Sequence, residues 1–149
     1  MKIAIGSDHA AYELKESIKK MLIKEGYDLL DVGTNSSCSV DYPVYGLALA
    51  KAVAAGEAKY GIALCGSGIG MSIVANKVHG IRAALACDGN RVALARQHNN
   101  ANVLVIGARF TEEEAALEMV KVFLQTEFEG QRHEKRVQLI TEYEQKSHE

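Results

Sequence analysis

The segment from Tyr60 to Gly70, which reads YGIALCGSGIG, combines a reactive side chain with a glycine-rich loop. An apolar, strand-like run leads into Cys65, and the loop that follows has glycine at every second position. A loop of this kind between a strand and a helix leaves backbone N–H groups free to bind an anion, and these groups also favour a thiolate over a thiol. The segment therefore predicts covalent or proton-transfer chemistry on a phosphorylated or enolate-forming substrate.

Simpler interpretations of this segment remain open. A free cysteine is most often a buried apolar residue, and the glycines could serve only tight turns. The loop could also belong to a dinucleotide-binding fingerprint, because Asp88 follows about 20 residues later, where an acid that binds ribose would stand. Against the fingerprint, Met71 replaces its third glycine and the chain leaves no room for a separate substrate domain.

Other candidate residues stand where predicted strands or helices end. Asp8 and His9 follow the first strand, where Asp8 would also be a good helix cap. His98 and Asn99 end a predicted helix, and a histidine there could simply complement the helix dipole. Arg109 follows the last strand.

Two arginines mark the last predicted helix. Arg132 and Arg136 are four residues apart, so their side chains share one helix face at a cost of about 0.2 to 0.5 kcal/mol. A bound phosphate would relieve that repulsion, whereas neighbouring glutamates would leave only a solvated helix face. Tyr42, beside Pro43, could either pack or bind a sugar hydroxyl.

Alternating strand-like and helix-like segments predict the framework that positions these residues. The predicted strands span residues 2–7, 27–32, 60–65, 81–86 and 102–107. The predicted helices span residues 11–25, 43–55, 69–78, 89–98, 111–125 and 131–145. This order predicts a doubly wound α/β sandwich with a five-stranded parallel sheet, whose ligand lies at the carboxyl ends of the strands.

Composition narrows the class further. The 149 residues predict one domain, and a net charge of -2 without a basic run predicts no binding to nucleic acid or to a membrane surface. We expect a soluble, cytoplasmic protein, because the uncharged runs are too short to span a bilayer and the three cysteines have no disulfide or zinc-site spacing. Since His79, His133 and His148 fall in predicted turns or on polar helix faces, we expect no metal.

Five blocks of sequence carry a resemblance to a known family. They read GSDHAA at 6–11, DYP at 41–43, CGSGIGMSIVANKVHGIRAA at 65–84, RQHNNANVLVIGAR at 96–109 and EGQRHEKRV at 129–137. Together they resemble the ribose-5-phosphate isomerase type B family, with its galactose-6-phosphate and allose-6-phosphate isomerase relatives. The resemblance implies a Rossmann-like three-layer αβα sandwich and an enzyme without a cofactor. It also implies a homodimer or larger assembly with composite active sites, to which the helix at about 131–145 contributes.

The activity that the resemblance implies is the interconversion of D-ribose 5-phosphate and D-ribulose 5-phosphate through an enediolate, in the non-oxidative pentose phosphate pathway. Cys65 would be the base, Ser67 and Asp8 would move the hydroxyl protons, and His98 would open the sugar ring from the partner subunit. The remaining implied contacts are Gly66, Gly68, Ile69 and Gly70 to the enediolate, Asn99 to sugar hydroxyls, and His9, Arg109, Arg132 and Arg136 to the phosphate.

Two alternatives stay open at this point. The substrate could be a six-carbon sugar phosphate, because the loop at 34–42 has no readable specificity code. The chain could also be a non-catalytic module that binds a sugar phosphate or nucleotide. Such a module would need the arginines and glycines but not Cys65.

Overall fold

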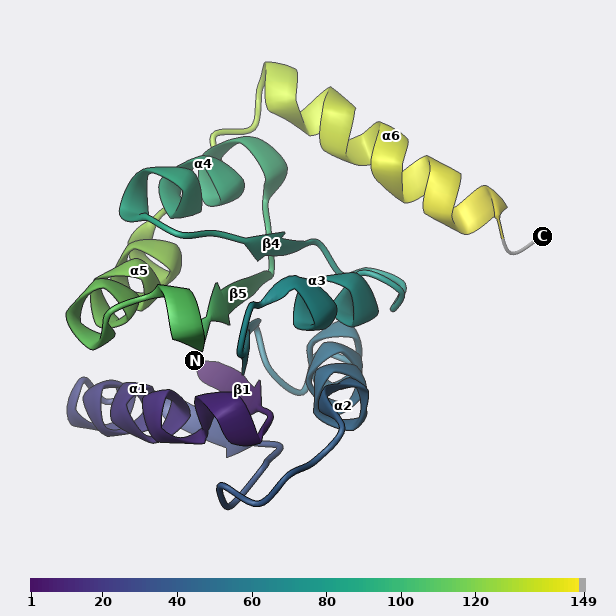
Figure 1. Cartoon of the computed structure of the whole chain (residues 1–149). Helices are drawn as coiled ribbons and strands as arrows, with labels where there is room; N and C mark the ends of the chain where they lie inside the picture. Colours follow the sequence, from purple (N-terminus) through teal and green to yellow (C-terminus); the bar gives the residue numbers. More distant parts are fainter. Residues whose placement is uncertain (148–149) are drawn as a thin grey trace.

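Five parallel strands in the order β2-β1-β3-β5-β4 form the centre of the computed structural model, which describes residues 1–147 (Figure 1). They are β1 Lys2–Ser7, β2 Asp28–Asp31, β3 Tyr60–Cys65, β4 Ala83–Leu85 and β5 Val103–Gly107. The strands are runs of apolar or small residues because helices cover both faces of the sheet. The predicted α/β fold with a five-stranded parallel sheet is confirmed.

Two layers of helices enclose this sheet. The helices are α1 Tyr12–Lys24, α2 Tyr42–Ala54, α3 Ile69–Ala75, α4 Gly89–Asn99, α5 Glu113–Gln125 and α6 Arg132–Lys146, with short 3-10 helices η1 His9–Ala11 and η2 Ala108–Phe110. Apolar residues of α1, α4 and α5 pack on one face of the sheet, and those of α2 and α3 pack on the other. Within residues 1–147, no helix is both long and apolar enough to cross a membrane.

The third predicted helix is shorter than expected, because Asn76 ends it. The Asn76 side chain donates to the carbonyls of Ser72 and Ala83 and accepts from the Ala83 N–H, at 2.8 to 3.0 Å. These bonds take up the backbone groups on the outer side of β4, so the helix stops at Ala75 instead of residue 78. The side chain thereby ties α3 to the edge strand.

Strand order and register bring three strand ends level at one edge of the sheet. From β1 the chain crosses to β2 on one side and then returns to β3 on the other, so the winding reverses between β1 and β3. Ser7 pairs with Leu64, and Cys65 pairs with Gly107. Ligands of such sheets bind outside the carboxyl edge at this reversal, which makes it the first place to look for a site.

A buried charge network supports the loop that leaves β2. Lys15 is fully buried, and its ammonium group donates to both oxygens of Asp31 at 2.7 and 2.8 Å. Lys19 also donates to Asp31, as does the N–H of Gly33 at 2.9 Å. Burial opposes ionisation of Asp31, but the hydrogen bonds from the two lysines and Gly33 outweigh it, so the pKa of this carboxyl lies below its usual value. The network fixes the start of the loop 33–41.

Candidate active site

Cys65 lies at the carboxyl end of β3 and is 4 % exposed. It packs within the apolar cluster beneath α2 and α3, as the simpler interpretation of a buried cysteine expects. The glycine loop follows at once and turns into α3 at Gly68, which has a φ of 79°. A cysteine buried to this degree exposes little of its surface to solvent.

The loop leaves some of its N–H groups for a ligand and uses others itself. The Ile69 N–H donates to the Ser67 Oγ at 3.1 Å. The first bond of α3 runs from the Ser72 N–H to the Gly68 carbonyl, so the N–H groups of Gly70 and Met71 precede the intrahelical bonds. Of the predicted contacts, Gly70 therefore keeps an N–H free of the helix ladder, whereas that of Ile69 is already bonded.

Asp8 and His9 lie beside this loop at the end of β1. Asp8 is buried, and its Oδ1 accepts from the N–H groups of Ala10 and Ala11 at 3.1 and 3.3 Å, so it caps η1. The Nδ1 of His9 accepts from the Val40 N–H at 3.1 Å. A neutral His9 bonded in this way carries its proton on Nε2, which can then donate to an anion.

Arg109 and Tyr42 cover two glycines of the loop. A methyl group added to Gly66 would lie 3.1 Å from the Nη1 of Arg109. The backbone N–H of Arg109 also donates to the Gly66 carbonyl at 2.9 Å. A methyl group added to Gly70 would lie 2.6 Å from a ring carbon and 2.8 Å from the hydroxyl of Tyr42. Glycine at both positions lets a guanidinium and a phenol approach the loop closely.

Asp88 has a structural role that argues against the dinucleotide interpretation. Its carboxylate accepts from the Arg91 N–H at 2.8 Å and pairs with the Arg91 guanidinium, which caps α4. The backbone hydrogen bond from Arg91 is the main reason why the pKa of Asp88 is lowered. A carboxylate engaged in this way is poorly placed to bind a ribose.

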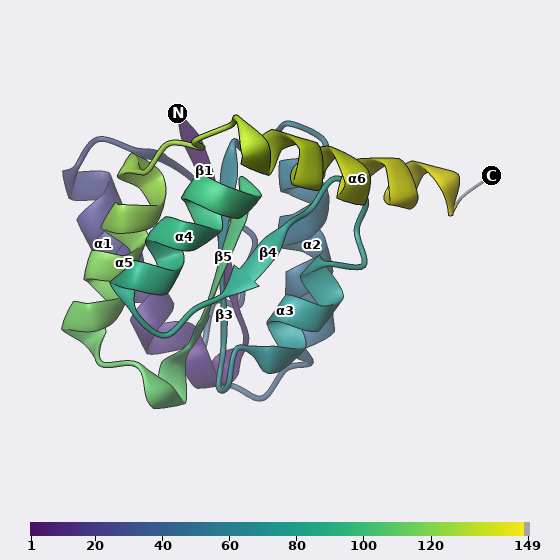
Figure 2. The ribbon, with the colours of Figure 1, turned by 90° about the horizontal axis from the view of Figure 1, so that it is seen from above.

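The remaining predicted site residues lie at the opposite, amino edge of the sheet. Because α4 runs back from the end of β4 to the start of β5, its last residues His98 and Asn99 lie near Val103. Arg132 and Arg136 are exposed on α6, which crosses this same edge, far from the loop after β3 (Figure 2). The pair Gly61–Val103 and the pair Cys65–Gly107 are four residue steps apart along the strands, or about 13 Å.

The predicted site is thus divided within one chain. The carboxyl edge holds the first set of predicted site residues: Asp8, His9, Tyr42, Cys65, Gly66, Ser67, Gly68, Ile69, Gly70 and Arg109. The amino edge holds the other set: His98, Asn99, Arg132 and Arg136. Residues of the second set cannot reach Cys65 of their own chain, because the two sets lie at opposite ends of the strands.

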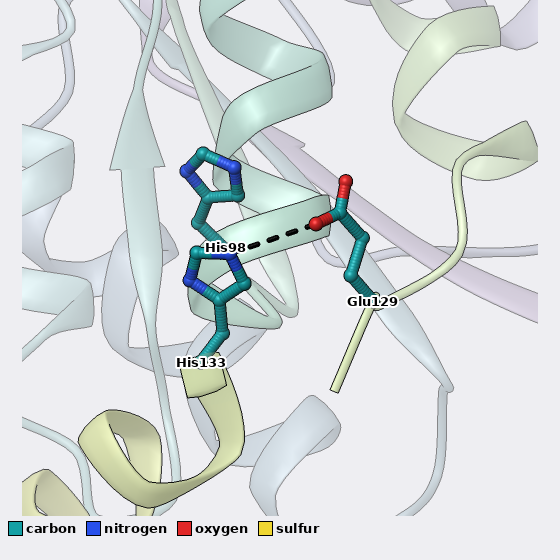
Figure 3. A group of neighbouring side chains, drawn as sticks. All are labelled: His98, Glu129 and His133. Carbon is teal, nitrogen blue, oxygen red and sulfur yellow. Dashed lines mark ion pairs between the residues drawn. The ribbon is translucent and has the colours of Figure 1, made fainter. Parts of the chain in front are cut away.

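Sequence reasoning missed the role of His133. It was expected in a turn or on a polar helix face, but it is 5 % exposed and stacks on His98, with ring centroids 4.1 Å apart and an interplanar angle of 11°. Its Nε2 lies 3.5 Å from the Oε2 of Glu129, four residues earlier (Figure 3). The four-residue spacing between Glu129 and His133 was the available signal.

The pKa of His133 is lowered, chiefly by burial and then by the neighbouring His98 and Arg132, while Glu129 acts in the opposite direction. The ligand-type atoms of His98, Glu129 and His133 all lie within 4.8 Å of one another. These three residues are therefore the group in residues 1–147 that could hold a metal ion. His148 lies outside the described residues.

Among the cavities of the described residues, two flank the sheet, and Cys65 lines neither of them. One of about 620 Å³ lies at the amino edge between α6 and β4 and includes Asn99, Arg82 and Tyr143. The other, of about 360 Å³, lies between the ends of β4 and β5 and includes Ser67 and Phe110.

Fold and site together define a class. An open parallel sheet with an acid, a thiol and cationic groups around a glycine loop is typical of α/β proteins that bind a small anionic substrate and move its protons. Residues 3–140 match the family model described as Ribose/Galactose Isomerase. The chain belongs to this ribose/galactose isomerase family, and the resemblance in the sequence is confirmed.

Individual relatives agree with this assignment. Ribose-5-phosphate isomerase B of Escherichia coli is 45% identical over 145 residues, which cover 97% of each chain. The structure of ribose-5-phosphate isomerase B from Clostridium thermocellum is 48% identical, with a TM-score of 0.97 and 99% of each chain covered. The enzyme of Mycoplasma genitalium with bound ribulose-5-phosphate is 38% identical, with a TM-score of 0.92 and coverage of 97% of this chain and 96% of that one.

Proposed function

We propose that this protein interconverts D-ribose 5-phosphate and D-ribulose 5-phosphate, a reaction of the non-oxidative pentose phosphate pathway. The observation that carries the proposal is the set at the carboxyl edge, where Cys65, Asp8 and Ser67 surround a loop with free N–H groups. The similarity to ribose-5-phosphate isomerase B of Escherichia coli supports ribose 5-phosphate as the substrate. The related enzyme of Mycoplasma genitalium has ribulose-5-phosphate, the proposed product, bound to it.

The proposed chemistry is a proton transfer between neighbouring carbons. The thiolate of Cys65 takes the proton from C2 of the open-chain aldose, the C2–H electron pair forms the C1–C2 double bond, and negative charge moves onto O1. The loop N–H groups stabilise that enediolate oxygen. The same thiol then returns the proton to C1, which gives the ketose without net oxidation or a cofactor.

In this mechanism, Asp8 and Ser67 move the hydroxyl proton between O2 and O1. Ser67 accepts the Ile69 N–H, so its own hydroxyl hydrogen remains available as a donor. The Asp8 Oδ1 holds two backbone N–H groups, which fixes the carboxylate and leaves its Oδ2 to accept a substrate proton. Both side chains are therefore oriented before the substrate arrives.

The phosphate and the closed sugar ring need the second set of residues. In the proposed dimer, the amino edge of one subunit faces the carboxyl edge of the other. It brings to that edge the residues His98, Asn99, Arg132 and Arg136. His98 would donate a proton to the ring oxygen as the ring opens, and the two arginines would join His9 and Arg109 around the phosphate. Exposed apolar side chains near the two edges support such an interface, and they are Ile69, Ile73, Leu85, Leu139, Ile140 and Tyr143.

The test is turnover of purified protein on ribose 5-phosphate in the presence of EDTA. Cys65→Ala should remove most turnover and leave affinity for the sugar phosphate within about tenfold, because the thiolate acts mainly in the transition state. Cys87→Ala is the matched control, since Cys87 is exposed. Allose 6-phosphate and galactose 6-phosphate, assayed in parallel, rank five-carbon against six-carbon substrates.

Each alternative has its own outcome in this experiment. Faster turnover of a six-carbon phosphate would change the substrate but keep the mechanism. Full activity of Cys65→Ala would remove the cysteine from the mechanism. Tight binding without turnover of any sugar phosphate would favour a binding module.

A further inference from the structure

Three metal-ligand side chains converge at the amino edge of the sheet, outside the Cys65 set. Figure 3 shows His98 from the end of α4 beside His133 from the first turn of α6, with Glu129 from the preceding linker alongside. Their nitrogen and oxygen atoms lie within 4.8 Å of one another. Two imidazoles and a carboxylate are ligands typical of zinc and similar divalent ions, and three protein ligands leave a position for water.

A backbone hydrogen bond and the turn that follows it hold Glu129 and His133 in place before any ion binds. The Glu129 N–H donates to the carbonyl of Gln97 at 3.1 Å, which fixes the linker against the residue before His98. Gly130 and Gln131, with φ angles of 67° and 52°, then turn the chain into α6. As a result the Glu129 Oε2 lies 3.5 Å from the His133 Nε2. Two ligands of a tetrahedral zinc ion lie about 3.4 Å apart, so this pair needs little movement.

His98 must turn to complete the set. The two imidazole rings are nearly parallel, so their lone pairs lie in nearly parallel, separate planes and do not converge on one point. His98 is half-buried and stacks on His133, but no hydrogen bond fixes its ring within the described residues. Rotation of the ring out of the stack would direct a nitrogen to an ion held by Glu129 and His133.

We propose that His98, Glu129 and His133 form a binding site for a divalent transition-metal ion such as zinc, and that the bound ion inhibits the enzyme. The inhibitory part rests on the proposed function, in which His98 opens the sugar ring. An imidazole that ligates an ion cannot also donate a proton to a sugar. Arg132 and Arg136 repel a cation, so the affinity is lower than that of a closed structural zinc site.

The test measures binding and turnover separately on the full chain. Zinc binding is followed by calorimetry, and cobalt is used as a spectroscopic probe, because thiolate ligands add a charge-transfer band that imidazole and carboxylate ligands do not. Glu129→Gln and His133→Asn should each weaken zinc binding by about 100-fold. Glu127→Gln, in the same exposed linker, and His79→Asn are matched controls that should bind zinc as the wild type does.

The expected result is one zinc ion per chain, a cobalt spectrum without a thiolate band, and inhibition of ribose 5-phosphate turnover that EDTA reverses. Unchanged affinity in Glu129→Gln and His133→Asn, or a thiolate band that is lost in Cys38→Ser or Cys87→Ser, would overturn the site. Zinc binding at the cluster without inhibition would overturn its effect on the enzyme. A protein that is inactive on sugar phosphates in EDTA, yet binds zinc at the cluster when EDTA is absent, would contradict the proposed function and leave the metal site standing.

Discussion

Several polar residues at the carboxyl edge have a structural and a proposed chemical role at once. Asp8 caps η1 through Oδ1, and Ser67 accepts the Ile69 N–H. His9 accepts the Val40 N–H, which joins the loop 33–41 to the site. Each side chain is therefore held by the backbone on one side and can face a ligand on the other. Because these side chains are already held in place, less conformational entropy is lost when a substrate binds.

Asp31 links that loop to the stability of the fold, and its contribution should depend on pH. Asp31→Asn leaves the fully buried Lys15 without its main partner, which should lower the free energy of unfolding by about 3 kcal/mol at pH 7. The folded-state pKa of Asp31 is lowered, so its stabilisation is present above the unfolded-state pKa of about 4 and is lost as the pH falls through the folded-state pKa.

Urea unfolding at a series of pH values checks this prediction. The difference between wild type and Asp31→Asn should be constant near neutral pH and shrink as the solution becomes acidic. Asp28→Asn, an exposed aspartate on the same strand, should change stability little at any pH. A difference between wild type and Asp31→Asn that stays constant down to the acid limit would contradict the assigned role of the carboxylate.

Single residues differ in how well the sequence revealed them. Cys65 and the glycines after it stand out, because a strand end and a turn are local features that a short segment encodes. The spacing between Glu129 and His133 is a local signal, but the burial of His133 depends on His98, 35 positions earlier in the chain, and no local pattern reports that contact. Asp88 matched a ribose-binding position by spacing alone, whereas the structure uses it as a helix cap.

The elements were predicted closely where local signals end them, and less well elsewhere. The strand at 60–65 matches β3, and the helix after Pro43 matches α2 to within a residue or so at each end. The helix at 69–78 was too long because Asn76 bonds to the neighbouring strand, a long-range contact. The sequence also predicted α6 but not which edge of the sheet it crosses, since that depends on packing against α4.

At this scale, α6 presents an arginine pair whose function can be tested without disturbing the fold. Arg132 and Arg136 are exposed, and neither forms an ion pair with a carboxylate in the described part of the chain. Replacing both by alanine should raise the KM for ribose 5-phosphate by roughly 100-fold, because each charge-assisted hydrogen bond to a phosphate contributes about 1.5 kcal/mol or more.

The readouts are steady-state kinetics and the thermal midpoint of unfolding, which should change little. Lys135→Ala provides the control, because Lys135 is an exposed cation between the two arginines in sequence and is not in the proposed clamp. An unchanged KM in the double variant would remove α6 from the phosphate site, whereas an equal loss in Lys135→Ala would point to a general charge effect.

At the scale of the whole molecule, the proposed catalytic residues of one chain lie on opposite edges of its sheet. Cys65 and His98 can act on one substrate only if two chains combine them. A two-fold symmetric pair would place the amino edge of each chain against the carboxyl edge of the other and create two identical sites. The exposed edge strand β4 and the outward reach of α6 suit such a pairing (Figure 1).

Subunit mixing tests this arrangement directly. Cys65→Ala and His98→Asn should each be nearly inactive alone, but a mixed assembly contains sites that take Cys65 from one chain and His98 from the other. After random association of equal amounts, about one quarter of the sites carry both native residues, so about one quarter of wild-type turnover should return. Mixing Cys65→Ala with Ser67→Ala should restore nothing, since both residues belong to the same edge of one chain. Activity that stays absent in the first mixture, although the chains assemble together, would show that each site is built from a single chain.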